Sequence, residues 1–161
     1  FGIYHDGEYH DRLFPYDPIP RIIASDEYDE LERGLKQRVN ALNAFLRDIY
    51  SDKNIIHDGV IPEEFVYTSP GYLPQVNGVT PPGGVFAHIA GEDLVQGEDG
   101  RWWVLEDNLR IPSGASYPLF VRDIERRADP KLFRDVSLRD NATIRVFCVK
   151  LWILFLLRGL L

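Results

Sequence analysis

Cysteine is scarce in this sequence and basic residues are outnumbered by acidic ones, and each of these features excludes a class of protein. The one cysteine, Cys148, cannot form an intramolecular disulfide bond, which makes a reducing, cytoplasmic setting the default. The formal net charge is -7, whereas proteins that bind nucleic-acid phosphates usually present a basic face. The N-terminal residues contain neither the basic nor the apolar region of a signal peptide. We therefore expect a cytoplasmic protein without a nucleic-acid partner.

Several familiar active-site patterns are missing as well. One cysteine and four scattered histidines offer no zinc-ligand spacing. The glycines in residues 81–84 lack the Lys-Ser/Thr pair and the helix of a phosphate-binding P-loop. No His–acid pair lies near Ser113 or Ser116 in the sequence, so a serine hydrolase is not supported. Methionine is absent and the chain begins at Phe1, which predicts a piece of a longer protein.

The residues that are present predict a globular α+β fold. The chain has 161 residues, of which 45% are hydrophobic and 12% aromatic, enough for one domain with a core. A turn at Asp6-Gly7 predicts a short N-terminal hairpin. Residues 25–50 begin with Ser25 as a candidate N-cap and an acidic first turn, and they predict one long amphipathic helix. Its apolar positions, which we expect to face the core, are Leu31, Leu35, Val39, Leu42, Phe45, Leu46 and Ile49.

A second antiparallel hairpin is predicted farther along the chain. Residues 85–95 and 101–108 are rich in β-branched and aromatic side chains, and residues 96–100 supply the glycines and acidic residues of a turn. In the region before this hairpin, glycine and proline mark turns. Residues 62–67 are predicted to form a short helix there.

The second hairpin gathers the chain's most informative polar residues. Side chains alternate along a strand, so Glu106 and Asn108 should share one face while Asp107 points to the other. Asp93 and Glu106 are similarly distant along the chain from Asp99 in the turn. A symmetric hairpin therefore places the Asp93 carboxylate beside Glu106 on the neighbouring strand.

Two carboxylates and one amide oxygen on a single patch suit a hard cation such as Mg²⁺. Mg²⁺ usually takes one or two protein carboxylates and fills its shell with water and substrate phosphates. Arg110 and the backbone N–H groups of Ser113 and Gly114 follow in the sequence, and such groups stabilise a transferred phosphoryl group. From the residues alone, an exposed acidic hairpin that binds no metal remains the common alternative.

Several separate stretches then resemble one family. The stretch "GEDLVQGEDGRWWVLEDNLRIPSG" is similar to the metal-binding hairpin of ATP-grasp ligases, in which a strand with Asp precedes a strand ending in Glu-x-Asn. The stretches "FPYDPIPRII", "LNAFLRDIY", "IIHDGVIPEEF" and "WWVLEDNLRIPSGASY" resemble the circularly permuted ATP-grasp proteins, bacterial proteins related to glutathionylspermidine-synthase-like ligases. The resemblance covers about residues 1–117.

The resemblance implies an activity and a ligand set. Enzymes of this kind activate a carboxylate with ATP, and an amine then attacks the acyl-phosphate to form an amide. Asp93, Glu106 and Asn108 would be the Mg²⁺ ligands that bridge the ATP phosphates. Arg110 would stabilise the transferred phosphoryl group or the acyl-phosphate. The loop over the acyl-phosphate would be shaped by Ser113 and Gly114.

Arg21 is a further candidate because prolines stiffen the segment that leads to it. Its guanidinium is suited to bidentate pairing with a substrate carboxylate or phosphate. The alternative is a structural ion pair with Asp17 or with the acidic start of the long helix.

The C-terminal part of the chain differs in character. Residues 118–161 form a charged segment followed by an apolar tail, residues 146–161, which is shorter than the roughly 20 apolar residues of a membrane-spanning helix. The nucleotide lobe, with its phosphate-binding lysines, would follow residue 117 in the permuted family, and its pattern is not seen here. The leading hypothesis is therefore a ligase fragment that lacks most of the ATP pocket. The alternatives are a non-catalytic binding module that needs a partner for the nucleotide lobe, and a truncated product without activity.

Overall fold

The long helix predicted from the sequence is the central element of the structure. The computed structural model describes residues 2–140, in which α1 spans Ser25–Ile49. The predicted cap is wrong by one residue: Ala24 occupies the N-cap position, and its carbonyl accepts the first helical hydrogen bond, from the N–H of Tyr28 at 2.9 Å. No side chain caps this end. The apolar tail, residues 146–161, lies outside the described residues.

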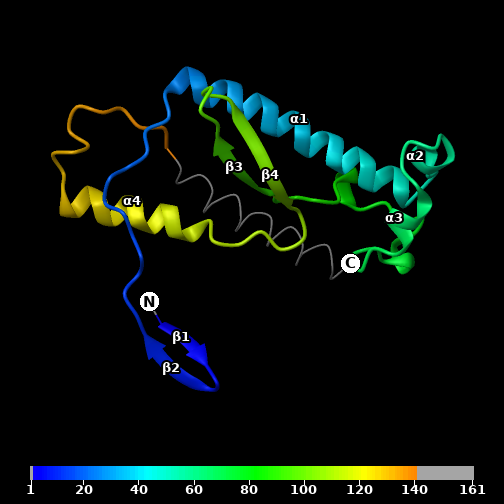
Figure 1. The fold of residues 1–161 in the computed structure, drawn as a ribbon, viewed down its shortest axis with the longest axis horizontal. Coiled ribbons are helices and arrows are strands. Elements are labelled where there is room, and N and C mark those ends of the chain that lie inside the picture. The colour runs from blue at the N-terminus through cyan, green and yellow to red at the C-terminus, as the bar shows by residue number, and fades with distance from the viewer. Residues whose placement is uncertain (1, 141–161) are drawn as a thin grey trace. The chain divides into compact units, whose positions relative to one another are not determined.

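The chain divides into two compact units. Within the described residues, one comprises residues 22–113, and the other comprises residues 2–21 together with residues 114–140. The first unit holds α1, the second hairpin and the short helices α2 (Asn54–His57) and α3 (Glu63–Tyr67). Within this unit, Figure 1 shows the hairpin beside the N-terminal part of α1 and the short helices at its C-terminal end.

The hairpin consists of β3 (Gly91–Gln96) and β4 (Trp102–Asn108), paired antiparallel. The predicted strand over residues 85–95 therefore began six residues too early. The reason lies in Asn43 of α1, whose Oδ1 accepts hydrogen bonds from the backbone N–H groups of Phe86 and Ala87, each at 2.9 Å. Its Nδ2 donates to the carbonyl of Ala87 at 3.2 Å. These backbone groups bond to a helix side chain, so they are not available for a strand ladder.

The hydrophobic core lies at the C-terminal end of α1. Ile49, Tyr50 and Val66 are buried there. The Tyr50 ring stacks on Tyr72 and Phe86, with ring centroids 5.3 and 5.7 Å apart. The predicted short helix near residues 62–67 is confirmed as α3. Two single-turn 3₁₀ segments, η1 (Pro74–Val76) and η2 (Pro82–Gly84), lead from this core toward β3.

The second unit contains the predicted N-terminal hairpin and a further helix. Strands β1 (Gly2–His5) and β2 (Glu8–Asp11) pair around a turn in which Asp6 and Gly7 have positive φ angles of 51° and 81°, as a tight two-residue turn requires. Helix α4 (Ser116–Ala128) covers the start of the charged segment, for which no helix was predicted from the sequence. The Tyr16 hydroxyl donates a hydrogen bond to Glu125 of α4, which raises the pKa of Tyr16 to about 12.

The α+β fold class, with two antiparallel hairpins and one long helix, is confirmed. Among residues 2–140, no helix combines the length and the apolar composition needed to cross a bilayer.

Candidate functional site

A β-bulge shapes the hairpin that carries the predicted metal ligands. Leu94 pairs with Val104, but the preceding residue of β3, Asp93, pairs with Glu106 rather than with Leu105. Leu105 is therefore an extra residue without a partner on β3. A bulge of this kind shifts the alternation of the strand, so residues beyond it change face.

Contacts with α1 identify which face of the hairpin each residue occupies. Glu27 Oε1 accepts hydrogen bonds from Gln96 Nε2 and from Trp102 Nε1, each at 2.8 Å. Beyond the bulge, Asp107 contacts Arg38 of the same helix. Trp102 and Asp107 both face α1 although they are five positions apart, an odd spacing that the extra residue Leu105 permits.

The predicted ligands consequently share the other face. Glu106 and Asn108 flank Asp107 in β4, so their side chains point away from α1. Asp93 is the ladder partner of Glu106, so its side chain points to the same face. All three side chains are exposed, and Asp93 and Glu106 are directly opposite each other in the ladder. The predictions that Asp93 lies beside Glu106, and that Glu106 and Asn108 share a face, are confirmed. Their roles as metal ligands stay predictions.

The donor set fits a hard cation. Asn108 Nδ2 donates a hydrogen bond to Glu106 Oε1 at 3.0 Å, which leaves the Asn108 amide oxygen as the atom that can bind a cation. Two carboxylates and this oxygen match the chemistry of a Mg²⁺ site that draws its other ligands from water and phosphates. In the part of the chain that the structure describes, no group of three or more His, Cys, Asp or Glu side chains could hold a metal ion. The candidate set has two carboxylates and depends on the amide for its third ligand.

The loop after Asn108 lies against the start of β3. A Cβ atom built on Gly91 would lie 3.3 Å from Pro112 Cβ and 3.8 Å from Asn108 Cβ, so the absence of a side chain at Gly91 allows this close approach. Arg110 and Ser113 belong to this exposed loop. Arg21 and Gly114 belong to the other unit, and their position relative to the carboxylates stays a prediction.

The pair behind the site was not predicted from the sequence. Arg38 Nε lies 2.7 Å from Asp107 Oδ1, and Nη2 lies 2.7 Å from Oδ2. This bidentate contact lowers the pKa of Asp107 and raises that of Arg38. The sequence carries no signal for this pair, because residues 102–105 are all apolar and show no two-residue alternation that the bulge would interrupt.

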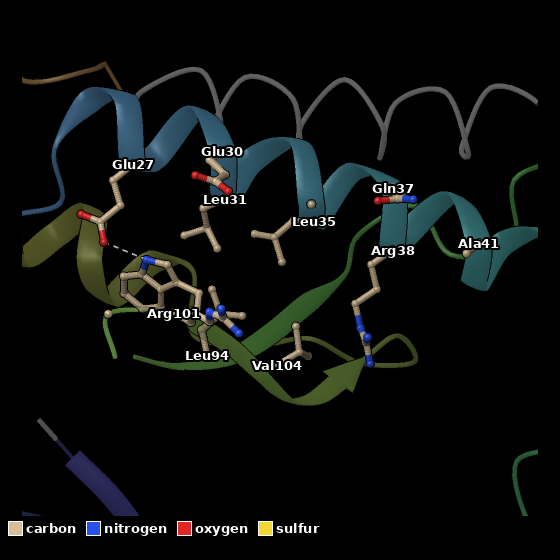
Figure 2. Close-up of a pocket in the computed structure, with 13 residues that line it drawn as sticks. Glu27, Glu30, Leu31, Leu35, Gln37, Arg38, Ala41, Leu94, Arg101 and Val104 are labelled. Atoms are coloured by element: carbon tan, nitrogen blue, oxygen red, sulfur yellow. Dashed lines mark hydrogen bonds between the residues drawn. The ribbon is translucent and has the colours of Figure 1, made fainter. Parts of the chain in front are cut away.

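A groove lies between the Glu27–Ala41 part of α1 and the β3–β4 hairpin. It has a volume of about 770 Å³ and is lined by a mixture of apolar and charged or polar side chains. Figure 2 shows Leu31 and Leu35 projecting from α1 toward Leu94 and Val104, with Glu27 near one end of the groove and Arg38 toward the other. The groove lies on the α1 face of the hairpin, so the candidate ligands do not line it.

The structure shows an α+β unit whose bulged hairpin presents Asp93, Glu106 and Asn108 on one exposed face, and comparison with known proteins identifies the family. The chain belongs to the circularly permuted ATP-grasp family, because residues 20–151 match the family model described as a circularly permuted ATPgrasp. The resemblance that the motifs indicated is confirmed. The match continues beyond residue 117, where the motif resemblance ended.

Curated relatives are considerably longer than this chain. An uncharacterized protein of Synechocystis sp. is 48% identical over 139 residues, which are 86% of this chain and 29% of the relative. An uncharacterized protein of Mycobacterium leprae is 44% identical over 150 residues, 93% of this chain and 25% of the relative. A Frankia casuarinae protein with the provisional name glutamate–cysteine ligase 2-2 is 44% identical over 126 residues, 78% of this chain and 14% of the relative. This chain therefore spans less than a third of the length of these relatives.

Proposed function

We propose that this chain supplies the Mg²⁺-binding part of an ATP-dependent carboxylate–amine ligase that acts in the cytoplasm. The observation that carries the proposal is the bulged hairpin, which gathers Asp93, Glu106 and Asn108 on one exposed face. In this proposal the metal-site region comprises residues 1–117, and residues 118–161 form a separate charged and apolar segment.

The proposed reaction forms an amide in two steps. A substrate carboxylate oxygen attacks the γ-phosphorus of ATP, the bond to the bridging oxygen breaks and ADP leaves. An amine nitrogen then attacks the acyl carbon and loses a proton, and phosphate leaves with the bonding electrons. The Frankia relatives support this class of reaction through their ligase names.

Individual residues have distinct tasks in this proposal. Asp93, Glu106 and the Asn108 amide oxygen would hold Mg²⁺, which supplies positive charge to the ATP phosphates when it is bound. Arg110 would stabilise negative charge on the transferred group, as a guanidinium near the phosphates does in other phosphoryl transfers. Ser113 and Gly114 would shape the loop beside it, and Arg21 would orient a substrate carboxylate.

A second candidate function uses the same exposed face of the hairpin. In this candidate the chain is a non-catalytic binding module, and a partner that supplies the nucleotide lobe completes the site. Both candidates use the same metal ligands, and they differ in whether this chain binds ATP alone.

Manganese provides a direct test of the metal site, because free Mn²⁺ gives an electron paramagnetic resonance signal that diminishes on binding. We expect the chain to bind Mn²⁺, and ATP to strengthen the binding since its phosphates complete the coordination shell. Glu106→Gln removes one of two ligand charges and should weaken binding by about tenfold or more, because changing residues that only hold metal ligands in place already costs about 10–100-fold.

The matched control is Glu98→Gln, which makes the same change at an exposed residue in the turn of the same hairpin. It should leave Mn²⁺ binding unchanged. Equal losses in both variants would reject the assignment of Glu106 as a ligand. Binding of Mn²⁺ that ATP does not strengthen until a partner is added would favour the binding-module candidate over the ligase.

A further inference from the structure

Arg38 has no role in the proposed chemistry, yet it holds the strand that presents two of the three proposed ligands. We propose that Arg38 is a positioning residue for the metal site, acting through Asp107 from the opposite face of the hairpin. The inference rests on the proposed function, since it assigns Glu106 and Asn108 as ligands. It adds a determinant outside the motif, on a helix that supplies no ligand.

The contact is well suited to fixing an orientation. Both carboxylate oxygens of Asp107 accept hydrogen bonds of 2.7 Å from the guanidinium of Arg38, and a bidentate pair of this kind fixes direction as well as distance. The Asp107 side chain is 14% exposed, whereas that of Arg38 is 44% exposed. Because Asp107 stands between Glu106 and Asn108 in β4, holding it toward α1 holds its two neighbours toward the other face.

Two anchors on α1 secure the two ends of β4. Glu27 binds Trp102 at the start of the strand, and Arg38 binds Asp107 near its end. Eleven residues of α-helix rise about 16 Å and complete about three turns, which places Glu27 and Arg38 on the same side of α1. Five residues of strand span about 16 Å at most. The two spacings match, so a helix and a bulged strand of these lengths can be joined at both ends.

The carboxylate of Glu92 explains why a positively charged side chain is needed behind the site. Glu92 is the ladder partner of Asp107, and its charge also raises the pKa of Arg38. The Oε1 atom of Glu92 is buried and has no hydrogen-bond partner among the described residues. Without Arg38, Glu92 and Asp107 would be two like charges directly opposite each other, an arrangement that destabilises strand pairing. That repulsion would act at the ladder step next to the Asp93–Glu106 pair.

The proposal and simple electrostatics predict opposite changes in Mn²⁺ affinity when Arg38 is removed. Arg38 is a positive charge near a cation site, so its removal should strengthen Mn²⁺ binding if charge alone matters. If Arg38 positions the ligands, its removal should weaken Mn²⁺ binding despite the more negative surroundings. The sign of the change in Mn²⁺ affinity therefore separates a positioning role from a purely electrostatic effect.

The experiment measures Mn²⁺ affinity by paramagnetic resonance for the intact 161-residue chain and for Arg38→Met. We expect about tenfold weaker binding, the size typical of lost contacts behind a metal site. Adding Asp107→Asn to Arg38→Met removes the unbalanced charge and should restore part of the affinity. Lys36→Met is the matched control, because Lys36 lies on the same helix but pairs with the exposed Glu32 of α1. That control should bind Mn²⁺ as the unmodified chain does.

Each other outcome has a definite meaning. Unchanged or tighter binding by Arg38→Met, in a chain whose unmodified form binds Mn²⁺ through Glu106, overturns the positioning role and leaves the proposed function standing. Absence of Mn²⁺ binding by the unmodified chain overturns both. Arg38→Lys serves if Arg38→Met fails to fold, because it keeps the charge and loses the bidentate geometry. Full affinity in the lysine variant would also contradict the proposal.

Discussion

Asn43 shows how one buried side chain can determine the path of a distant segment. Its Nδ2 donates to the carbonyls of Val39 and Ala87 at 3.1 and 3.2 Å. Its Oδ1 accepts from the N–H groups of Phe86 and Ala87. Three of the four contacts bond Asn43 to the backbone of Phe86 and Ala87, just before β3, and these backbone groups are therefore not available to extend the strand.

Substituting Asn43 therefore tests how the hairpin is attached to α1. Asn43→Ala leaves backbone groups of Ala87, a buried residue, without partners, and we expect a loss of about 2–3 kcal/mol in the free energy of unfolding. Urea denaturation measures this loss. Asn40→Ala, on an exposed position of the same helix, should change the free energy of unfolding by less than about 0.5 kcal/mol. Similar losses for the two variants would show that the Asn43 contacts contribute little.

The junction between α1 and α2 depends on a carboxylate. Asp48 Oδ2 accepts a hydrogen bond from the N–H of Ile55 at 2.8 Å. Its Oδ1 accepts from the backbone and side-chain nitrogens of Asn54, at 3.0 and 2.9 Å. Lys53 adopts a left-handed conformation with φ of 59° just before α2, so the carboxylate binds the first N–H groups of a helix that begins abruptly after α1.

These contacts give the junction a defined pH dependence. The N–H of Ile55, with smaller contributions from Asn54, lowers the pKa of Asp48 below its ordinary value of 3.8. The stabilisation is therefore complete above about pH 4 and is lost as the pH falls through the lowered pKa. We expect Asp48→Asn to melt at a lower temperature than the unmodified chain at neutral pH. The difference should shrink in acid as the unmodified chain loses its carboxylate.

Thermal unfolding followed by circular dichroism from pH 7 down to about pH 2 measures this difference. Asp52→Asn provides the control, since it removes a negative charge from an exposed position in the same connection. Its melting temperature should follow that of the unmodified chain at every pH. A gap between Asp48→Asn and the unmodified chain that stays constant with pH would contradict the account of this junction.

Elements with a local pattern were predictable, and those that depend on distant contacts were not. The long helix follows from helical spacing within residues 25–50, and the Asp6-Gly7 turn from two adjacent residues. The start of β3 was predicted six residues too early because the strand is limited by contacts with Asn43, which lies more than 40 residues away along the chain. Pairing of Asp93 with Glu106 was predicted from turn symmetry, but the bulge at Leu105, which turns these residues to a common face, was not.

At the scale of the whole molecule, the family assignment and the candidate metal site rest on different observations. Membership of the circularly permuted ATP-grasp family rests on a match over residues 20–151. The candidate ligands could be selected from sequence because their spacing and motif lie within one hairpin. Arg38 could not, since its contact with Asp107 joins residues 69 positions apart and is visible only when helix and strand are placed together.

The most direct test of the central claim locates the bound ion. Mn²⁺ broadens the nuclear magnetic resonance signals of nearby atoms, so a titration of the ¹⁵N-labelled chain shows which amides lie closest to it. We predict that the amides of Asp93, Glu106 and Asn108 broaden first, and that Glu106→Gln removes this pattern. Broadening centred instead on the acidic first turn of α1 at Asp26 and Glu27, or spread evenly over the exposed carboxylates, would contradict a metal site on the β3–β4 hairpin.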